Sequence, residues 1–211
     1  FYGVYDVLYF KFEEGSGTTA NDASGSSNNG EIRGNPSWAT GQIGSAIQLD
    51  GTDDYITVPD SPSLRITAYT VSVWIRPQVD TEFWTGVIGK PGRNFNFWLG
   101  ESNDPDGYVH HRFHTTASTN DGCADTAANS IPMNAWTHVV ITNTGTTCKT
   151  FINSREVVVH TGFPALVVDN TNVNIGRGLD WSFADTGTGG TFSGLIDEVR
   201  ILSVARSMTT A

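Results

Sequence analysis

The sequence has few charged residues, only two cysteines and no long apolar run. Of its 211 residues 16% are charged, and 22 acidic residues outnumber 12 lysines and arginines, which gives a formal net charge of −10. The shortage of basic residues argues against nucleic acid or an anionic membrane as the main partner. No apolar run approaches the length of a membrane-spanning helix, so we expect no membrane insertion.

The first segment, FYGVYDVLYFKF, lacks the basic-then-apolar pattern of a signal peptide. We expect either that a signal has been removed or that the chain is a module of a larger secreted protein. No linker or shift in composition divides the sequence, which predicts one domain over residues 1–211.

Apolar periodicity of the helical kind is absent, while short β-prone segments recur between turn signals. The run TVSVWIRP alternates apolar and polar side chains as a half-buried strand does. The dipeptide Asp50-Gly51 predicts a hairpin or a bend between SAIQLDG and DDYITVP. About twelve such strands predict an all-β fold, a two-sheet antiparallel β-sandwich.

The two cysteines, Cys123 and Cys148, lie in the polar segments NDGCAD and GTTCKT. Exposed thiols are liabilities in an oxidising medium, and a disulfide between them would close a loop of about 25 residues and contribute about 3 kcal/mol. Two unrelated reduced thiols are the alternative. A disulfide favours secretion, and two cysteines alone do not build a zinc site with four ligands.

The segment YVHHRFH, residues 108–114, holds three of the five histidines. On a strand, Val109, His111 and Phe113 share one side, which we assign to the core. His110 and His114 would then lie roughly 13 Å apart, too far to share a metal ion. The opposite side carries Tyr108, His110, Arg112 and His114.

The preceding segment NFNFWLG alternates in the same way, with its phenylalanines on one side and Asn96 and Trp98 on the other. Aromatic faces stack on sugar rings, and histidine and arginine donate hydrogen bonds to hydroxyl or carboxylate groups. We therefore predict a ligand-binding face, with an ordinary solvated strand face as the alternative. The predicted ligand residues are Asn96, Trp98, Tyr108, His110, Arg112, His114 and, in the loop GLDWSFADTGTGG, Trp181.

Several segments in order resemble the laminin-G-like jelly-roll family of the concanavalin A-like lectin and glucanase superfamily: YFKFEEGSGTTANDASGSSNNG, GSAIQLDGTDDYITVPDSPSL, YTVSVWIRP, WTHVVI, KTFINSREV, NVNIGRG and FSGLIDEVRI. The resemblance covers nearly the whole chain and is weakest between residues 83 and 123. It implies two face-packed antiparallel sheets, one bent to a concave surface, with the terminal strands side by side. It also implies a secreted module that binds carbohydrate or protein and often holds a structural calcium.

Three carboxylates are candidates for that calcium: Asp22 in NDASG, Asp50 in LDGTDDY and Asp197 in LIDEVR. Calcium prefers such oxygen ligands, and pairing of the terminal strands would bring Asp22 towards Asp197. The alternative is that Asp22 and Asp50 form Asx-type turns and that Asp197 accepts backbone hydrogen bonds.

Catalytic patterns are weak. The Glu-x-Asp-x-x-Glu run of the superfamily's glucanases is absent, and no Gly-x-Ser-x-Gly elbow occurs. Tyr108, His110, Arg112 and His114 resemble the residue set of its polysaccharide lyases, but YFKFEEG lies at the wrong end of the chain for the terminal strand of those enzymes. We therefore expect a non-catalytic carbohydrate-binding module that uses the concave face. The alternatives are a protein-interaction or adhesion module that uses rim loops and, as the weaker candidate, a polysaccharide-degrading enzyme.

Overall fold

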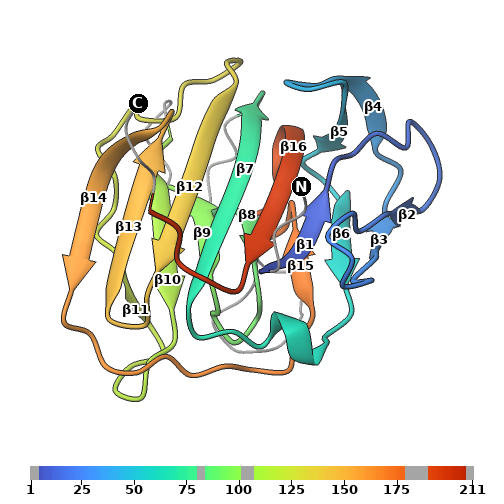
Figure 1. Cartoon of the computed structure of the whole chain (residues 1–211). Helices are drawn as coiled ribbons and strands as arrows, with labels where there is room; N and C mark the ends of the chain where they lie inside the picture. Colours follow the sequence, from blue (N-terminus) through green and yellow to red (C-terminus); the bar gives the residue numbers. More distant parts are fainter. Residues whose placement is uncertain (1–4, 80–83, 101–106, 179–189, 208–211) are drawn as a thin grey trace.

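The structure is a computed structural model that describes residues 5–79, 84–100, 107–178 and 190–207. Within these ranges the chain forms sixteen strands and one short 3-10 helix, η1 (Pro62–Leu64). The strands make two stacked antiparallel sheets (Figure 1), which confirms the predicted all-β sandwich. No helix in the described part of the chain has the length and apolar character needed to cross a bilayer.

The first sheet, in front in Figure 1, has eight strands. Seven follow one another across the sheet, and the N-terminal strand β1 (Asp6–Phe10) pairs with β16 beside them. The order of the seven is β14 (Arg155–Thr161), β13 (Thr147–Ile152), β12 (Thr137–Asn143), β7 (Tyr69–Pro77), β16 (Ser193–Leu202), β5 (Ser45–Asp50) and β4 (Ser37–Thr40).

The second sheet lies behind the first in that view and also has eight strands. Its strands are shorter, and three of them, β8, β9 and β10, position the site described below. Their order is β11 (Asp121–Gly122), β10 (Val109–Phe113), β9 (Asn96–Leu99), β8 (Thr85–Gly89), β15 (Val173–Ile175), β6 (Tyr55–Val58), β3 (Gly30–Arg33) and β2 (Thr19–Ala20).

The terminal strands lie side by side, as the resemblance implied. Strand β1 runs antiparallel to β16 with Phe10 opposite Val199. An ion pair between Asp6 and Arg200, 2.6 Å apart, joins the same two strands at their side chains. A bulge in β16 after Asp197 ends its pairing with β5, so that β1 and β5 pair with successive parts of one strand.

The Asp50-Gly51 turn is a bend between the sheets and not a hairpin. Strand β5 pairs with β16 in the first sheet, whereas β6 pairs with β15 in the second. Gly51 has a φ of 81°, a conformation that glycine adopts without steric cost. The carboxylate of Asp54 accepts backbone hydrogen bonds from Asp50 and Asn35 and so holds the bend closed.

The core fills the space between the sheets. The alternation predicted for β7 is confirmed, because Val71, Val73 and Ile75 are buried while the residues between them are half-buried. In the second sheet Phe97 and Phe113 enter the same core. Side chains of the opposite parity therefore point away from the first sheet, and we call that side of the second sheet the outer face.

Candidate functional site

Three neighbouring strands bring a row of side chains together on the outer face. His110 of β10 lies opposite Trp98 of β9, and Trp98 lies opposite Gly86 of β8. Residues directly opposite each other in an antiparallel pair share a face, so the register alone places His110 beside Trp98. Their strand neighbours His111 and Phe97 are fully buried on the core side.

Four rings lie together on this face, and we call Trp84, Trp98, Tyr108 and His110 the ring cluster. The ring centroid of His110 lies 4.1 Å from that of Trp84 and 5.8 Å from that of Trp98. Trp84 meets Tyr108 edge-on at 6.4 Å, with their planes at 87°. Trp84 and Tyr108 each lie just before a strand, and both are half-buried. They form an aromatic corner that solvent reaches.

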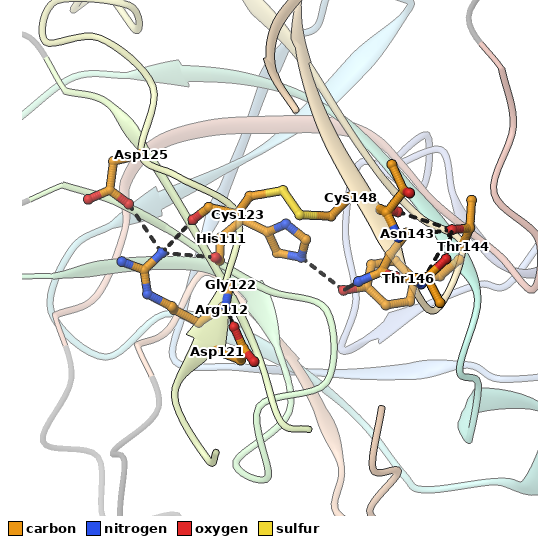
Figure 2. The surroundings of a disulfide bond; sticks show 12 residues. His111, Arg112, Asp121, Gly122, Cys123, Asp125, Asn143, Thr144, Thr146 and Cys148 are labelled. Atoms are coloured by element: carbon orange, nitrogen blue, oxygen red, sulfur yellow. Dashed lines mark hydrogen bonds and ion pairs between the residues drawn. A yellow bond between two sulfur atoms is a disulfide. The ribbon is translucent and has the colours of Figure 1, made fainter. Parts of the chain in front are cut away.

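A carboxylate connects the polar side chains of this face. Asp125 Oδ1 accepts hydrogen bonds from His110 Nδ1 at 2.8 Å and from Arg112 Nη1 at 3.2 Å. Arg112 Nη1 also donates to the backbone oxygens of Cys123 and His111 (Figure 2). Gly122 lies opposite Arg112, and a Cβ there would come within 2.7 Å of Arg112 Cδ, so glycine lets the arginine lie across the strand.

His110 is neutral at pH 7. Burial and, to a smaller extent, the charge of Arg112 lower its pKa to about 4, because Asp125 only partly opposes both effects. Because a carboxylate only accepts hydrogen bonds, the Nδ1 of His110 carries the ring proton and Nε2 carries the lone pair. The hydrogen-bond acceptor of His110 is therefore Nε2. The second polar group of this face is Arg112, whose positive charge Asp125 compensates.

Two predicted ligand residues are not exposed, and that part of the prediction is wrong. Asn96 is 1% exposed, and its amide accepts a hydrogen bond from Lys90 N at 2.7 Å and donates one to Lys90 O at 2.8 Å. Its polar groups are used to close the turn between β8 and β9. Trp98 is 7% exposed because the guanidinium of Arg93 and the ring of His110 cover it. Trp98 forms the floor of the ring cluster.

The other predicted ligand residues fall into two groups. Tyr108, His110 and Arg112 lie together in the candidate site. His114 lies one residue beyond β10, where its backbone pairs with Arg93 and Val167. Trp181 lies outside the described residues. The sequence did not indicate Trp84 or Asp125 as residues of the candidate site, because only the fold brings them into contact with His110.

The cysteines form the predicted disulfide, with their Cα atoms 6.0 Å apart. Both are buried, at 2% and 0% exposure, so the exposure expected from their polar neighbours is wrong. Cys148 belongs to β13 of the first sheet, and Cys123 follows β11 of the second. The bond therefore ties the sheets together where the loop that carries Asp125 begins (Figure 2).

Asp22 fits the turn alternative better than a calcium ligand. Its Oδ1 accepts hydrogen bonds from the backbone of Tyr9 and Ser24, and its Oδ2 from the Ser24 hydroxyl and the Asn28 backbone. Asp50 likewise accepts from the backbone of Thr52. With donors on both carboxylate oxygens, Asp22 has little capacity left for a cation.

Asp197 differs from Asp22 and Asp50, because one of its oxygens has no partner. The residue is fully buried; Oδ2 accepts a hydrogen bond from Ile43 N at 2.9 Å, while Oδ1 is buried without a hydrogen-bond partner. Burial raises its pKa to about 6. Among the described residues, no cluster of three metal-ligating side chains joins Asp22 to Asp197; the acidic cluster is Asp50, Asp53 and Asp54.

A laminin-G-like family model, described as the concanavalin A-like lectin/glucanases superfamily, matches residues 50–210. None of the curated proteins compared with the chain matches its sequence. Among solved structures, domain 4 of AbnA, a GH43 extracellular arabinanase from Geobacillus stearothermophilus, in complex with arabinotriose, is similar with a TM-score of 0.66 and 24% identity over 96% of this chain and 94% of that one.

Toxin binding domains have the same architecture. The binding domain of Paraclostridial Mosquitocidal Protein 1 is similar with a TM-score of 0.73 and 18% identity, over 97% of this chain and 50% of that chain. The botulinum neurotoxin serotype D binding domain is similar with a TM-score of 0.65 and 16% identity, over 96% of this chain and 49% of that chain. The chain thus spans about half of each toxin binding domain. At these identities the likenesses show a common fold.

Proposed function

The chain belongs to the laminin-G-like family of the concanavalin A-like lectin/glucanases superfamily, and from that premise we propose that it is a non-catalytic module that binds a neutral oligosaccharide. The proposed site is the aromatic corner of Trp84 and Tyr108 with His110, Arg112 and Asp125. The observation that carries this proposal is the ring cluster, in which Trp84 and Tyr108 are half-buried, beside the charge-compensated Arg112 on one sheet face.

Each part of the site suits a sugar. Trp84 or Tyr108 would stack on the C–H face of a pyranose or furanose ring, burying apolar area while the hydroxyl groups stay hydrogen-bonded. His110 Nε2 would accept a hydrogen bond from a hydroxyl group, and Arg112 would donate one. Because Asp125 compensates the charge of Arg112, the site favours an uncharged sugar over a uronate or a sulfate.

A similar solved structure supports a saccharide ligand. The arabinanase domain was solved with arabinotriose, a neutral trisaccharide, and aligns with nearly the whole of this chain. A secreted or cell-surface location is part of the proposal; the buried disulfide supports it, since such bonds persist in oxidising compartments.

The experiment that tests the site compares two tryptophans. Trp84→Ala should weaken binding of neutral arabino-oligosaccharides at least about tenfold in calorimetry, because it removes the stacking surface. Trp74→Ala is the matched control: Trp74 is also half-buried and stacks on a histidine, His138, at 4.8 Å, but on the first sheet. Equal affinities for the two variants, or no binding of any neutral glycan by the parent chain, would refute the proposal.

The absence of catalysis is a separate part of the proposal. Glycoside hydrolysis uses two carboxyl groups about 5 to 9.5 Å apart. The carboxylate at the ring cluster, Asp125, already accepts hydrogen bonds from His110 and Arg112, which does not suit a catalytic acid or nucleophile. Incubation of the chain with polysaccharides should release no new reducing ends and no unsaturated products. Turnover that is lost in His110→Ala would instead establish an enzyme.

A structural calcium is also proposed, and Asp197 is the candidate that fits. Its buried Oδ1 lacks a partner, and a hard cation takes such an oxygen. Calcium should then raise the melting temperature of the parent chain and leave that of Asp197→Asn unchanged. Asp22→Asn should keep the calcium response, because the oxygens of Asp22 already accept hydrogen bonds.

A second candidate function is protein binding through β14. This edge strand is exposed along its length, and Val157 and Val159 are 42% and 52% exposed. Unpaired strand edges can add a strand from a partner. Binding to an extracellular protein that is lost in Val159→Lys and kept in Trp84→Ala would favour this function over glycan binding.

A further inference from the structure

A second cluster of reactive side chains lies in the core, on the side of β10 opposite the ring cluster. His111 comes from β10, Cys148 from β13 and Cys123 from the loop after β11. Their ligand atoms, one ring nitrogen and two sulfurs, all lie within 4.8 Å of one another. All three residues are at most 2% exposed. The cluster thus joins the two sheets at a buried point.

The ring of His111 is only half satisfied. Its Nε2 lies 2.9 Å from the hydroxyl of Tyr69, which also accepts a hydrogen bond from Asn143. Its Nδ1 is buried and has no hydrogen-bond partner. Figure 2 shows the His111 ring beside the Cys123–Cys148 bond. A buried nitrogen without a partner costs folding free energy, and such a group calls for a functional explanation.

We propose that reduction of the disulfide converts this cluster into a binding site for one soft divalent cation such as Zn²⁺, held by Cys123, Cys148 and His111. A dithiol reductant is oxidised to its own disulfide and leaves two thiols in the chain. Metal binding releases the two thiol protons and uses the Nδ1 lone pair of His111. The ion then links the two sheets in place of the S–S bond.

The geometry suits this ion. Zn–S bonds of about 2.3 Å and Zn–N bonds of about 2.0 Å place the ligand atoms about 3.5 to 3.8 Å apart. The ligand atoms of the cluster already lie within 4.8 Å of one another, and the two sulfurs separate once their bond is reduced. Two thiolates and one imidazole are ligands of the soft type that Zn²⁺ and Co²⁺ accept. Three protein ligands leave the fourth position of the ion open.

The contact between Nε2 of His111 and the Tyr69 hydroxyl would orient the ring for an ion at Nδ1. With Nδ1 on the ion, Nε2–H donates to the Tyr69 hydroxyl oxygen. Such a bond orients the ligating ring, and its loss in metal sites typically weakens affinity 10- to 100-fold.

Cobalt is the probe for the test, because Co²⁺ bound by thiolates absorbs in the near-ultraviolet and tetrahedral Co²⁺ absorbs in the visible. The full chain, reduced anaerobically with a phosphine, should bind one Co²⁺ with both absorption features, and Zn²⁺ should displace it. Oxidised chain should show neither feature. His111→Asn should weaken binding at least about tenfold, and Cys148→Ser should abolish it. His138→Asn, on the far face of the first sheet, is the control and should bind as the parent does.

If reduction unfolds the chain, circular dichroism with added Zn²⁺ provides a second test. In that case Zn²⁺ should restore the β-sheet circular dichroism of the reduced parent and fail to do so in His111→Asn. The proposal is overturned if the reduced parent neither binds Co²⁺ nor regains structure with Zn²⁺. Equal metal affinity of His111→Asn and the parent overturns it as well.

Discussion

Asp125 Oδ1 lies 2.8 Å from Nδ1 of His110, although the two residues are 15 positions apart along the chain. The same oxygen accepts a hydrogen bond from Arg112, and the loop that carries Asp125 begins at Cys123. A residue from outside the three strands therefore connects the polar side chains of the outer face, and it follows the disulfide-bonded Cys123 closely in the chain.

Asp125→Ala should change the preference of the site as well as its strength. Without the carboxylate, the charge of Arg112 is uncompensated, so anionic glycans should gain affinity and show a stronger salt dependence. Neutral oligosaccharides should lose about tenfold, because His110 loses the bond that orients it. Calorimetry at low and high salt measures both effects. Unchanged affinities for both ligand classes would show that Asp125 does not shape the site.

Lys90→Met should lower the free energy of unfolding by about 3 to 5 kcal/mol, because it leaves the carboxylates that pair with the buried ammonium group without this cation. Lys90 is 0% exposed, and its Nζ lies 3.1 Å from Asp60 and 3.8 Å from Asp169. Lys149→Met is the control: Lys149 pairs with Glu156 at the surface, where such pairs contribute about 0 to 1 kcal/mol. Urea unfolding compares the variants, and equal losses would contradict a structural role for the buried lysine.

Acid should destabilise the chain as pH falls below about 6.5, the usual histidine pKa. The pKa values of His110 and His111 are lowered to about 4 and about 3. Between those values and 6.5 the unfolded chain binds more protons, so stability is full above 6.5 and decreases towards pH 4. Asp197, with a pKa raised to about 6, opposes this trend between its unfolded value and pH 6.

Unfolding free energies at pH 7, 6 and 5 measure this slope. His111→Asn should reduce the slope of the unfolding free energy against pH by at most about 1.4 kcal/mol per pH unit, which is the contribution of one proton. A parent chain whose stability rises as pH falls from 7 to 5 would mean that raised carboxyl pKa values outweigh the histidines.

Replacing both cysteines with serine should cost about 3 kcal/mol, because the closed loop is short, with a sequence separation of 25. The same variant should bind neutral oligosaccharides more weakly, since the loop of Asp125 is no longer tied to the first sheet. Denaturant unfolding and calorimetry test the two effects separately. Full affinity in a destabilised variant would show that the loop holds its position without the bond.

Much of the fold was predictable from alternation along single strands. Val71, Val73 and Ile75 are buried where the pattern of β7 predicts, and the two sides of β10 separate core from outer face as expected. The likeness to a known family also gave the pairing of the terminal strands. These features depend on local periodicity or on segment order, which a single sequence contains.

The sequence by itself determined which side chains share a face, because the direction of a side chain on a strand follows from its parity. Only the tertiary structure decided which of them reach solvent: Arg93 covers Trp98, and the turn at Lys90 uses the amide of Asn96. It also decided that Asp125 joins the site and that His111 stands beside the disulfide. Such contacts join residues distant in sequence, and their distances depend on the packing of whole sheets.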